Sequence, residues 1–184
     1  MCGVIGVAGP AAFRYQSEIN ESLDVLHHRG PDGRGIYKSE CGHVVFGHRR
    51  LSILDLDGGA QPMVARSGKV AVTFNGEIYN HQTLRGDLKD LGFEFETASD
   101  TEVLIAAYEQ WGEACVNYLD GMFAFAIHDV AKQRIFLARD RAGEKPLFYV
   151  QIGSLFAFSS ELKGLLSLDA IPKKIDAYAL NQYL

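Results

Sequence analysis

The stretch MFAFAIHD at residues 122–129 alternates bulky and small apolar side chains with a period of two. Alternate residues of a strand point to opposite faces of its sheet. The two phenylalanines and the isoleucine would therefore share one face, and the two alanines the other. This asymmetry suits a strand in a sheet held between a layer of helices and a second sheet.

Further apolar runs surround this stretch, with turn residues between them. Downstream runs at 134–139, 146–151 and 154–160 predict, together with 122–129, four consecutive antiparallel strands. Upstream runs predict strands at 3–8, 35–40, 43–48 and 70–75.

Helices are expected between these runs. Residues 17–28 carry a helical apolar stripe with Ser17 as N-cap. Leu84, Leu88 and Leu91 share one helical face. Residues 99–102 have capping-box spacing and precede a second stripe that ends at Trp111. The pattern as a whole predicts an α+β fold, with two packed sheets and helices outside.

Composition narrows the class of protein. The chain has 184 residues, 47% of them hydrophobic, which fits one globular domain or one domain and the start of another. A net charge of −5 and the lack of extended lysine or arginine runs argue against nucleic acid or an anionic membrane as partner. No apolar run approaches the ~18 to 20 residues of a membrane span, and the start lacks the basic region of a secretory signal. Three cysteines, an odd and sparse set, favour a reduced, cytoplasmic protein.

Cys2 is the most informative single residue. Removal of Met1, which is usual before a small second residue, would leave Cys2 with a free α-amine. Such an amine has a pKa of about 7.7 to 8.0, so it can accept the thiol proton directly or through a water molecule. The alternative is that Cys2 is only a small buried residue of a first strand.

Asn75, Gly76 and Glu77 follow the expected strand at 70–75. An asparagine amide and the next backbone N–H at a strand end can form an oxyanion hole. The alternative is a simple turn, the commoner fate of an Asn-Gly pair.

Charged residues near two other elements suggest an amino-acid ligand. Arg49 and Arg50 end an apolar strand, and an arginine fork matches a carboxylate, although one of the two is expected to be surface charge. Asp100 lies in the first turn of a helix, where it would either stabilise the helix dipole or accept a ligand ammonium group.

A metal site is not expected. His27, His28, His43 and His48 fit no zinc spacing, and we expect them to hydrogen-bond within loops. For Cys41 and Cys115 the default prediction is that of small, buried apolar residues.

Seven segments in a fixed order are far more specific than any of these signals alone. They are MCG at 1–3, HRGPDG at 28–33, GHRRLSI at 47–53, FNGEIYN at 74–80, SDTE at 99–102, DRAGEKPLFY at 140–149 and SSELK at 159–163. From Met1 to about Lys163 the chain closely resembles the N-terminal glutaminase domain of glutamine-dependent asparagine synthetases, which are class II glutamine amidotransferases. Glu144 is a small departure, because an apolar residue is commoner there.

The resemblance implies the N-terminal nucleophile hydrolase fold, a four-layer αββα sandwich. It implies that Met1 is removed, that Cys2 is the nucleophile with its own amine as base, and that Asn75 and Gly76 form the oxyanion hole. Glutamine would be hydrolysed to glutamate and ammonia through a cysteinyl thioester.

The resemblance also implies how L-glutamine is held. Arg50 would bind its α-carboxylate, and Glu77 and Asp100 its α-ammonium group. Main-chain groups of the loop through Ile53 and Leu54 would line the pocket.

We therefore expect a type-2 glutamine amidotransferase domain at 1–165, and at 166–184 the start of an ATP-dependent synthetase domain that is otherwise missing. ATP and magnesium would belong to that domain, in the same chain or a separate one, and no cofactor or metal to this one. The ammonia acceptor stays open between aspartate and another carboxylate. Two other classes of function are alternatives: an amidase for another amino-acid-like amide, and a non-catalytic module. The pairing of arginine with a carboxylate and of acidic residues with an ammonium group favours a free amino acid over another amide substrate. The sequence contains both the nucleophile and the oxyanion donor, which argues against a non-catalytic module.

Overall fold

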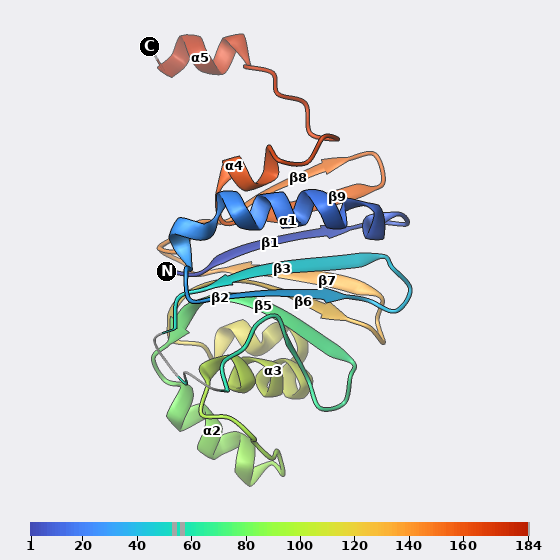
Figure 1. Ribbon diagram of the computed structural model, residues 1–184. Helices are drawn as coiled ribbons and strands as arrows, with labels where there is room; N and C mark the ends of the chain where they lie inside the picture. Colours follow the sequence, from blue (N-terminus) through green and yellow to red (C-terminus); the bar gives the residue numbers. More distant parts are fainter. Residues whose placement is uncertain (53–54, 56–57, 184) are drawn as a thin grey trace.

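Two antiparallel sheets stack face to face, and helices cover both outer faces (Figure 1). The computed structural model describes residues 1–52, 55 and 58–183. The five-stranded sheet runs, in spatial order, β2 (Gly33–Lys38), β3 (Val44–Arg50), β1 (Gly3–Ala8), β9 (Leu155–Ser159) and β8 (Phe148–Ile152). The four-stranded sheet runs β4 (Met63–Val64), β5 (Val70–Ile78), β6 (Gly121–Asp129) and β7 (Arg134–Arg139).

Each sheet has its own helices. Packed on the five-stranded sheet are α1 (Gln16–Val25) and α4 (Leu162–Leu165). Beneath the four-stranded sheet lie α3 (Asp100–Trp111), which contacts β5, and α2 (His81–Asp90), which packs on α3. This is the αββα sandwich that the sequence predicts. A last helix, α5 (Ala177–Tyr183), lies apart from the sandwich with every residue exposed (Figure 1).

The alternation in β6 divides its side chains between two cores, as predicted. Phe123, Phe125 and Ile127 join the cluster that β5 and β6 form with α2 and α3. Ala126 faces the other way and packs between the sheets, in a cluster that includes Phe46. The small side chain on that face leaves room for the rings of the opposite sheet.

The strand that carries Asn75 is longer than predicted. β5 pairs with β6 without a break from Val70 opposite Asp129 to Ile78 opposite Gly121. Asn75 and Gly76 therefore lie inside a continuous strand, and both the turn and the strand end expected at this pair are wrong. Gly76 serves close packing here, because a Cβ on it would lie 2.8 Å from the Cα of Phe123.

The last four strands are not consecutive neighbours, contrary to the prediction. β6 pairs with β7 and β8 pairs with β9, but the chain crosses between the sheets after β7. Asp140 organises this crossing, because its carboxylate accepts hydrogen bonds from the backbone N–H groups of Phe123, Glu144 and Lys145. The buried carboxylate thus accepts hydrogen bonds from backbone N–H groups that strand pairing leaves without a partner.

Helix and cysteine predictions are confirmed in part. Ser99 caps α3 by accepting a hydrogen bond from the N–H of Glu102, as expected. By contrast, α1 begins at Gln16 without a side-chain cap, so Ser17 is not its N-cap. Leu91 follows the last residue of α2 and is exposed. Cys115 is buried as predicted, whereas Cys41 is exposed because it lies in the turn between β2 and β3.

Packing of the sandwich continues past α4, where Leu168 and Ile171 are buried against the five-stranded sheet's helical layer. From residue 172 to 183 the chain is exposed throughout. None of the helices in the described part of the chain is long and apolar enough to cross a membrane.

The rings between the sheets predict a steric limit at Gly6. A Cβ on Gly6 would overlap the ring of Phe158 and lie 2.8 Å from Cδ1 of Phe46, two rings that meet edge to face. Gly6→Ala should therefore lower the free energy of unfolding by about 1–3 kcal/mol in denaturant titrations. The matched change Gly86→Ala, in an exposed turn of α2 with open space around it, should raise it by about 0.5–1 kcal/mol. Equal effects of the two changes would contradict this account of Gly6.

Candidate active site

Cys2 lies just before β1, a central strand that pairs with β3 on one side and β9 on the other. Its Sγ accepts a hydrogen bond from the backbone N–H of Leu51 at 3.4 Å and lies 3.7 Å from the carbonyl oxygen of the same residue. Burial raises the pKa of this thiol, and the bond to Leu51 and the nearby charges of Arg50 and Arg29 oppose the shift. The thiol is thus held in its neutral form and needs a proton acceptor before it can attack.

A cavity of about 120 Å³ opens beside Cys2, between the same ends of both sheets. Six of the eight residues proposed from sequence are described, and all six line it. The lining residues are Met1, Cys2, Arg50, Leu51, Gly59, Gln61, Phe74, Asn75, Gly76, Glu77, Ser99, Asp100, Thr101, Met122 and Lys145.

The other two proposed residues, Ile53 and Leu54, lie outside the described part of the chain. Next to them, Asp55 ties this loop to its surroundings. Its carboxylate accepts backbone hydrogen bonds from Gly58 and Ala98, and its carbonyl accepts one from Arg50.

The two adjacent arginines have different surroundings, as the sequence suggests. Arg50 points into the cavity, whereas Arg49 points to α1, where it binds Asp24 at 3.0 Å and donates to the carbonyl of Leu23. Because consecutive residues of a strand face opposite ways, only one of the pair can reach the cavity.

Asn75 brings an unused hydrogen-bond donor to the cavity. The residue is 1% exposed, and its Nδ2 has no hydrogen-bond partner among the described residues. An unsatisfied buried donor costs about 1–3 kcal/mol, so its persistence suggests an acceptor that arrives with a ligand.

Two carboxylates complete the cavity. Asp100 is the first residue of α3 and is buried; its Oδ2 accepts a hydrogen bond from the N–H of Ile78 at 3.0 Å. Burial raises its pKa, and the bond to Ile78 opposes the shift. Glu77, the residue before Ile78 on β5, is half-buried and lines the same space. A site with a half-buried arginine fork and two carboxylates offers complementary partners to both charged groups of a free amino acid.

Four polar residues of the cavity were not among those proposed from sequence: Gln61, Ser99, Thr101 and Lys145. Gln61 spans from β5 to α3: its Oε1 accepts from the N–H of Phe74, and its Nε2 donates to the Phe74 carbonyl and to Thr101. Lys145 is 6% exposed and comes from the crossing loop between the sheets. Lys145 belongs to one of the seven segments quoted above and could have been found there, but no pattern marks Gln61.

The amino terminus shares these surroundings. Burial lowers the pKa of the Met1 amine, and the positive charges of Arg29 and Lys145 lower it further, while Cys2 and Asp32 act in the opposite direction. Burial at this end of the chain therefore favours the neutral form of a terminal amine, which is the form that can accept a proton.

The sequence predicts that the four histidines considered above as metal ligands all lie in loops, and this is wrong for His48. His48 lies in β3, fully buried between the sheets, with its Nδ1 3.0 Å from the hydroxyl of Thr73 in β5. Its Nε2 has no partner among the described residues, and burial together with the charge of Arg50 lowers its pKa to about 3. Within 1–52, 55 and 58–183, no cluster of three or more histidine, cysteine or acidic side chains could hold a metal ion.

Comparison with known proteins shows the family to which this chain belongs. The family model described as "Glutamine amidotransferase domain" matches residues 1–184. The chain belongs to this family. It is 39% identical over 186 residues to asparagine synthetase [glutamine-hydrolyzing] 3 of Bacillus subtilis, covering 99% of this chain and 30% of that protein. It is 38% identical over 181 residues to asparagine synthetase B [glutamine-hydrolyzing] of Escherichia coli, covering 96% and 32%.

Solved amidotransferase structures share the fold. The glutamine phosphoribosylpyrophosphate amidotransferase of B. subtilis superposes with a TM-score of 0.73 at 25% identity, covering 90% of this chain and 43% of that one. A structure titled as the allosteric regulatory enzyme of purine biosynthesis gives 0.74 at 26% identity, with the same coverage. The αββα sandwich is therefore that of the N-terminal nucleophile hydrolases. The chain spans about a third of the length of the synthetases it matches.

Buried His48 predicts a pH-dependent stability. The folded pKa of about 3 lies below the ordinary 6.5, so the unfolded chain binds a proton that the folded chain does not. Stability should therefore fall as pH drops below 6.5, by at most about 1.4 kcal/mol per pH unit from this residue. Denaturant titrations at several pH values between 7 and 5 give the slope of the unfolding free energy against pH. This slope should be smaller for His48→Asn than for the unaltered protein, and unchanged for His27→Asn, an exposed control. The slope of His48→Asn should not vanish, because burial also lowers the pKa of His128. Equal slopes in His48→Asn and the unaltered protein would show that His48 does not contribute to the pH dependence of stability.

Proposed function

We propose that this domain hydrolyses the side-chain amide of L-glutamine, with Cys2 as nucleophile. The observation that carries the proposal is the Nδ2 of Asn75, which has no hydrogen-bond partner among the described residues and lies in one cavity with the Cys2 thiol and the Arg50 guanidinium. A donor held ready without a partner is what a transient oxyanion requires.

In this mechanism Met1 is removed, and the free α-amine of Cys2 accepts the thiol proton directly or through a water molecule. Sγ then attacks the amide carbon of glutamine. Asn75 Nδ2 and the backbone N–H of Gly76 hold the oxyanion, and the ammonium form of the amine returns its proton to the leaving nitrogen, which departs as ammonia. A γ-glutamyl thioester remains. Water attacks it, the thiol is released, and glutamate is the second product.

Recognition of both charged ends of glutamine would hold its amide over the thiol. Arg50 would bind the α-carboxylate bidentately, and Glu77 and Asp100 the α-ammonium group. Main-chain groups at Ile53 and Leu54 would close the pocket. Fixing the substrate in this way converts its binding energy into orientation of the reacting atoms. The thiol and amine supply the proton transfers, so we propose no metal or cofactor for this domain.

We further propose that the ammonia is used by an ATP-dependent synthetase domain that acts with residues 1–165 and starts at 166–184, in the same or a separate chain. Both synthetases compared above are named as glutamine-hydrolysing asparagine synthetases, which supports aspartate as acceptor. ATP and magnesium would bind there. Three free cysteines, with Cys41 exposed, support a cytoplasmic location.

Replacing the nucleophile tests the mechanism. Cys2→Ala should release no ammonia above background from glutamine, because no thioester can form. Glutamate and ammonia release should be measured on protein whose intact mass shows that Met1 is absent. Near-normal hydrolysis by Cys2→Ala would refute the mechanism.

The two arginines provide a matched test of recognition. Arg50→Ala should raise the KM for glutamine by about 10- to 100-fold, since a charge-assisted pair is worth about 1.5–3 kcal/mol. Arg49→Ala, which loses only contacts to α1, should leave KM within about twofold. Steady-state kinetics with glutamine, and with asparagine as a shorter substrate, would check both. An unchanged KM in Arg50→Ala would remove Arg50 from the site.

A further inference from the structure

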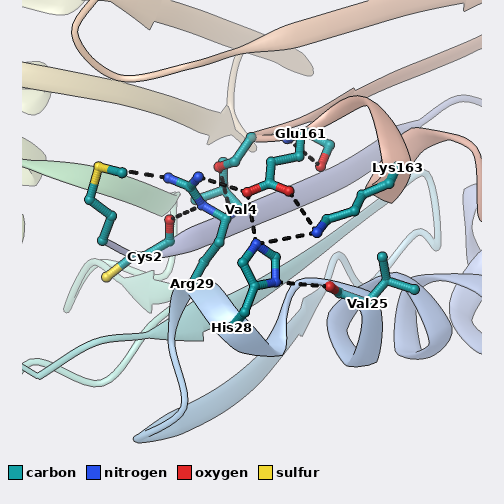
Figure 2. Close-up of polar contacts among 10 residues, drawn as sticks. Cys2, Val4, Val25, His28, Arg29, Glu161 and Lys163 are labelled. Carbon is teal, nitrogen blue, oxygen red and sulfur yellow. Dashed lines mark hydrogen bonds and ion pairs between the residues drawn. The ribbon is translucent and has the colours of Figure 1, made fainter.

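Arg29 contacts the backbone of Cys2 (Figure 2) but is not one of the residues that line the cavity. Its Nε donates a hydrogen bond to the carbonyl oxygen of Cys2 at 2.9 Å. Its side chain is 7% exposed, so the guanidinium is nearly cut off from solvent. Chain ends fray unless something ties them down, and Cys2 becomes the chain end when Met1 is removed. The Arg29 contact is therefore a tether for the nucleophile's main chain.

Glu161 in turn holds Arg29. Its Oε1 accepts hydrogen bonds from Nη1 of Arg29 and from Nε2 of His28, each at 2.9 Å. Its Oε2 lies 3.1 Å from Nζ of Lys163. Burial opposes ionisation of Glu161, but the hydrogen bonds from Arg29, His28 and Lys163 outweigh it and lower the pKa of the carboxyl to about 2, so the carboxylate stays ionised across the working range.

Strand pairing places Glu161 at the level of Cys2. β9 lies beside β1, and just beyond β9 Ser160 exchanges two hydrogen bonds with Val4: the Val4 N–H donates to Oγ of Ser160, and the Ser160 N–H donates to the Val4 carbonyl. The next residue, Glu161, is thereby fixed close to the start of β1. The ion pair with Arg29 thus joins two elements that meet at the nucleophile.

We propose that Glu161 is a positioning residue for the glutaminase reaction, which locks the Arg29 guanidinium so that it holds the Cys2 carbonyl and keeps Sγ aimed into the cavity. The inference rests on the proposed function. Neither Glu161 nor Arg29 lines the cavity, so Glu161 acts on the reaction only through the nucleophile's backbone.

The geometry of the guanidinium explains why a carboxylate is needed. The group is planar, and its donors have fixed directions. One bond through Nε to Cys2 leaves the plane free to rotate about that contact. A second bond through Nη1 to Glu161 fixes the plane, and the charge of Glu161 compensates a cation that is otherwise nearly buried.

Lys163, another partner of the Glu161 carboxylate, provides a matched control. Lys163 contacts the same carboxylate but reaches it from the solvent side, with 48% of its side chain exposed. Within the described part of the chain it forms no hydrogen bond or ion pair with Arg29 or Cys2, and its Nζ also lies 3.3 Å from Nε2 of His28. Loss of Lys163 removes one charge from Glu161 and leaves the tether intact.

The test compares Glu161→Gln with Lys163→Gln in glutamine hydrolysis, on protein shown by mass to have lost Met1. Glu161→Gln should lower kcat by about 10- to 100-fold, the range expected when a reacting atom is displaced by about 1 Å, and leave the KM for glutamine within about twofold. Lys163→Gln should keep both constants within about twofold. A general loss of structure would move KM and thermal stability together with kcat.

A second variant keeps the inference testable if Glu161→Gln does not fold. Arg29→Lys retains the charge facing Glu161 but cannot bond to both partners in one plane, so it should lower kcat at constant KM. Where both fold, the double variant should be no slower than the slower single variant, because both changes break the same tether. Wild-type kcat in Glu161→Gln or in Arg29→Lys, or additive effects of the two changes, would overturn the inference. Failure of the unaltered protein to release ammonia would instead overturn the proposed function.

Discussion

The close approach of the two sheets is the constraint on which the rest of the structure depends. Cys2 and Arg50 belong to one sheet, and Asn75 to the other, so the cavity exists only where both sheets end side by side. That approach is possible because the facing side chains alternate in size. Ala126 leaves space for the rings of the opposite sheet, and Gly6 leaves space for those rings to meet edge to face. The site is thus a consequence of how the sandwich closes.

Polar contacts across the interface add register to this packing. His48 meets Thr73 near the cavity, and Tyr37 meets Nδ1 of His128 in a hydrogen bond at 2.9 Å. Both histidines have lowered pKa values because burial penalises a charge there. A neutral histidine can bond across an apolar interface without the cost of an unpaired ion, and a directional bond fixes which residues face each other. The sheets therefore meet in one arrangement, with Asn75, two residues beyond Thr73 on β5, at the cavity.

Residues that act through local patterns were predictable from sequence. The alternation at 122–129 correctly gave two packed sheets, because side-chain period and burial are properties of a single strand. Ser99 was found as a cap because the capping box lies within four residues. The sequence predicts a strand end at Asn75 and Gly76, with a turn as the alternative, because the dipeptide favours a turn in isolation, whereas uninterrupted pairing with β6 keeps both residues extended.

Contacts between distant segments left no local signal. The crossing after β7 depends on the buried carboxylate of Asp140 and not on the spacing of the apolar runs. Gln61 enters the cavity by bonding to β5, and Glu161 meets Arg29 across 132 positions of chain. Placement of the site residues in one cavity was therefore expected from the family resemblance, while the groups that support them appear only in three dimensions.

Desolvation at the amino terminus acts in opposite directions on the Cys2 thiol and on the terminal amine. It raises the pKa of the thiol and lowers that of the Met1 amine, so burial at this end of the chain favours the neutral form of both kinds of group. Forming a thiolate and an ammonium group before the substrate binds would cost desolvation free energy in this partly buried site. A neutral thiol and amine avoid that cost until a carbonyl carbon is within reach. Proton transfer and attack then develop charge on the substrate oxygen, and the Nδ2 donor of Asn75, which no described residue uses, is placed to receive it. The positive charges of Arg29 and Arg50 favour the same step, since they oppose the rise in the thiol pKa. The reactivity of the thiol would thus depend on the presence of its substrate, which follows from burial and does not require a separate base.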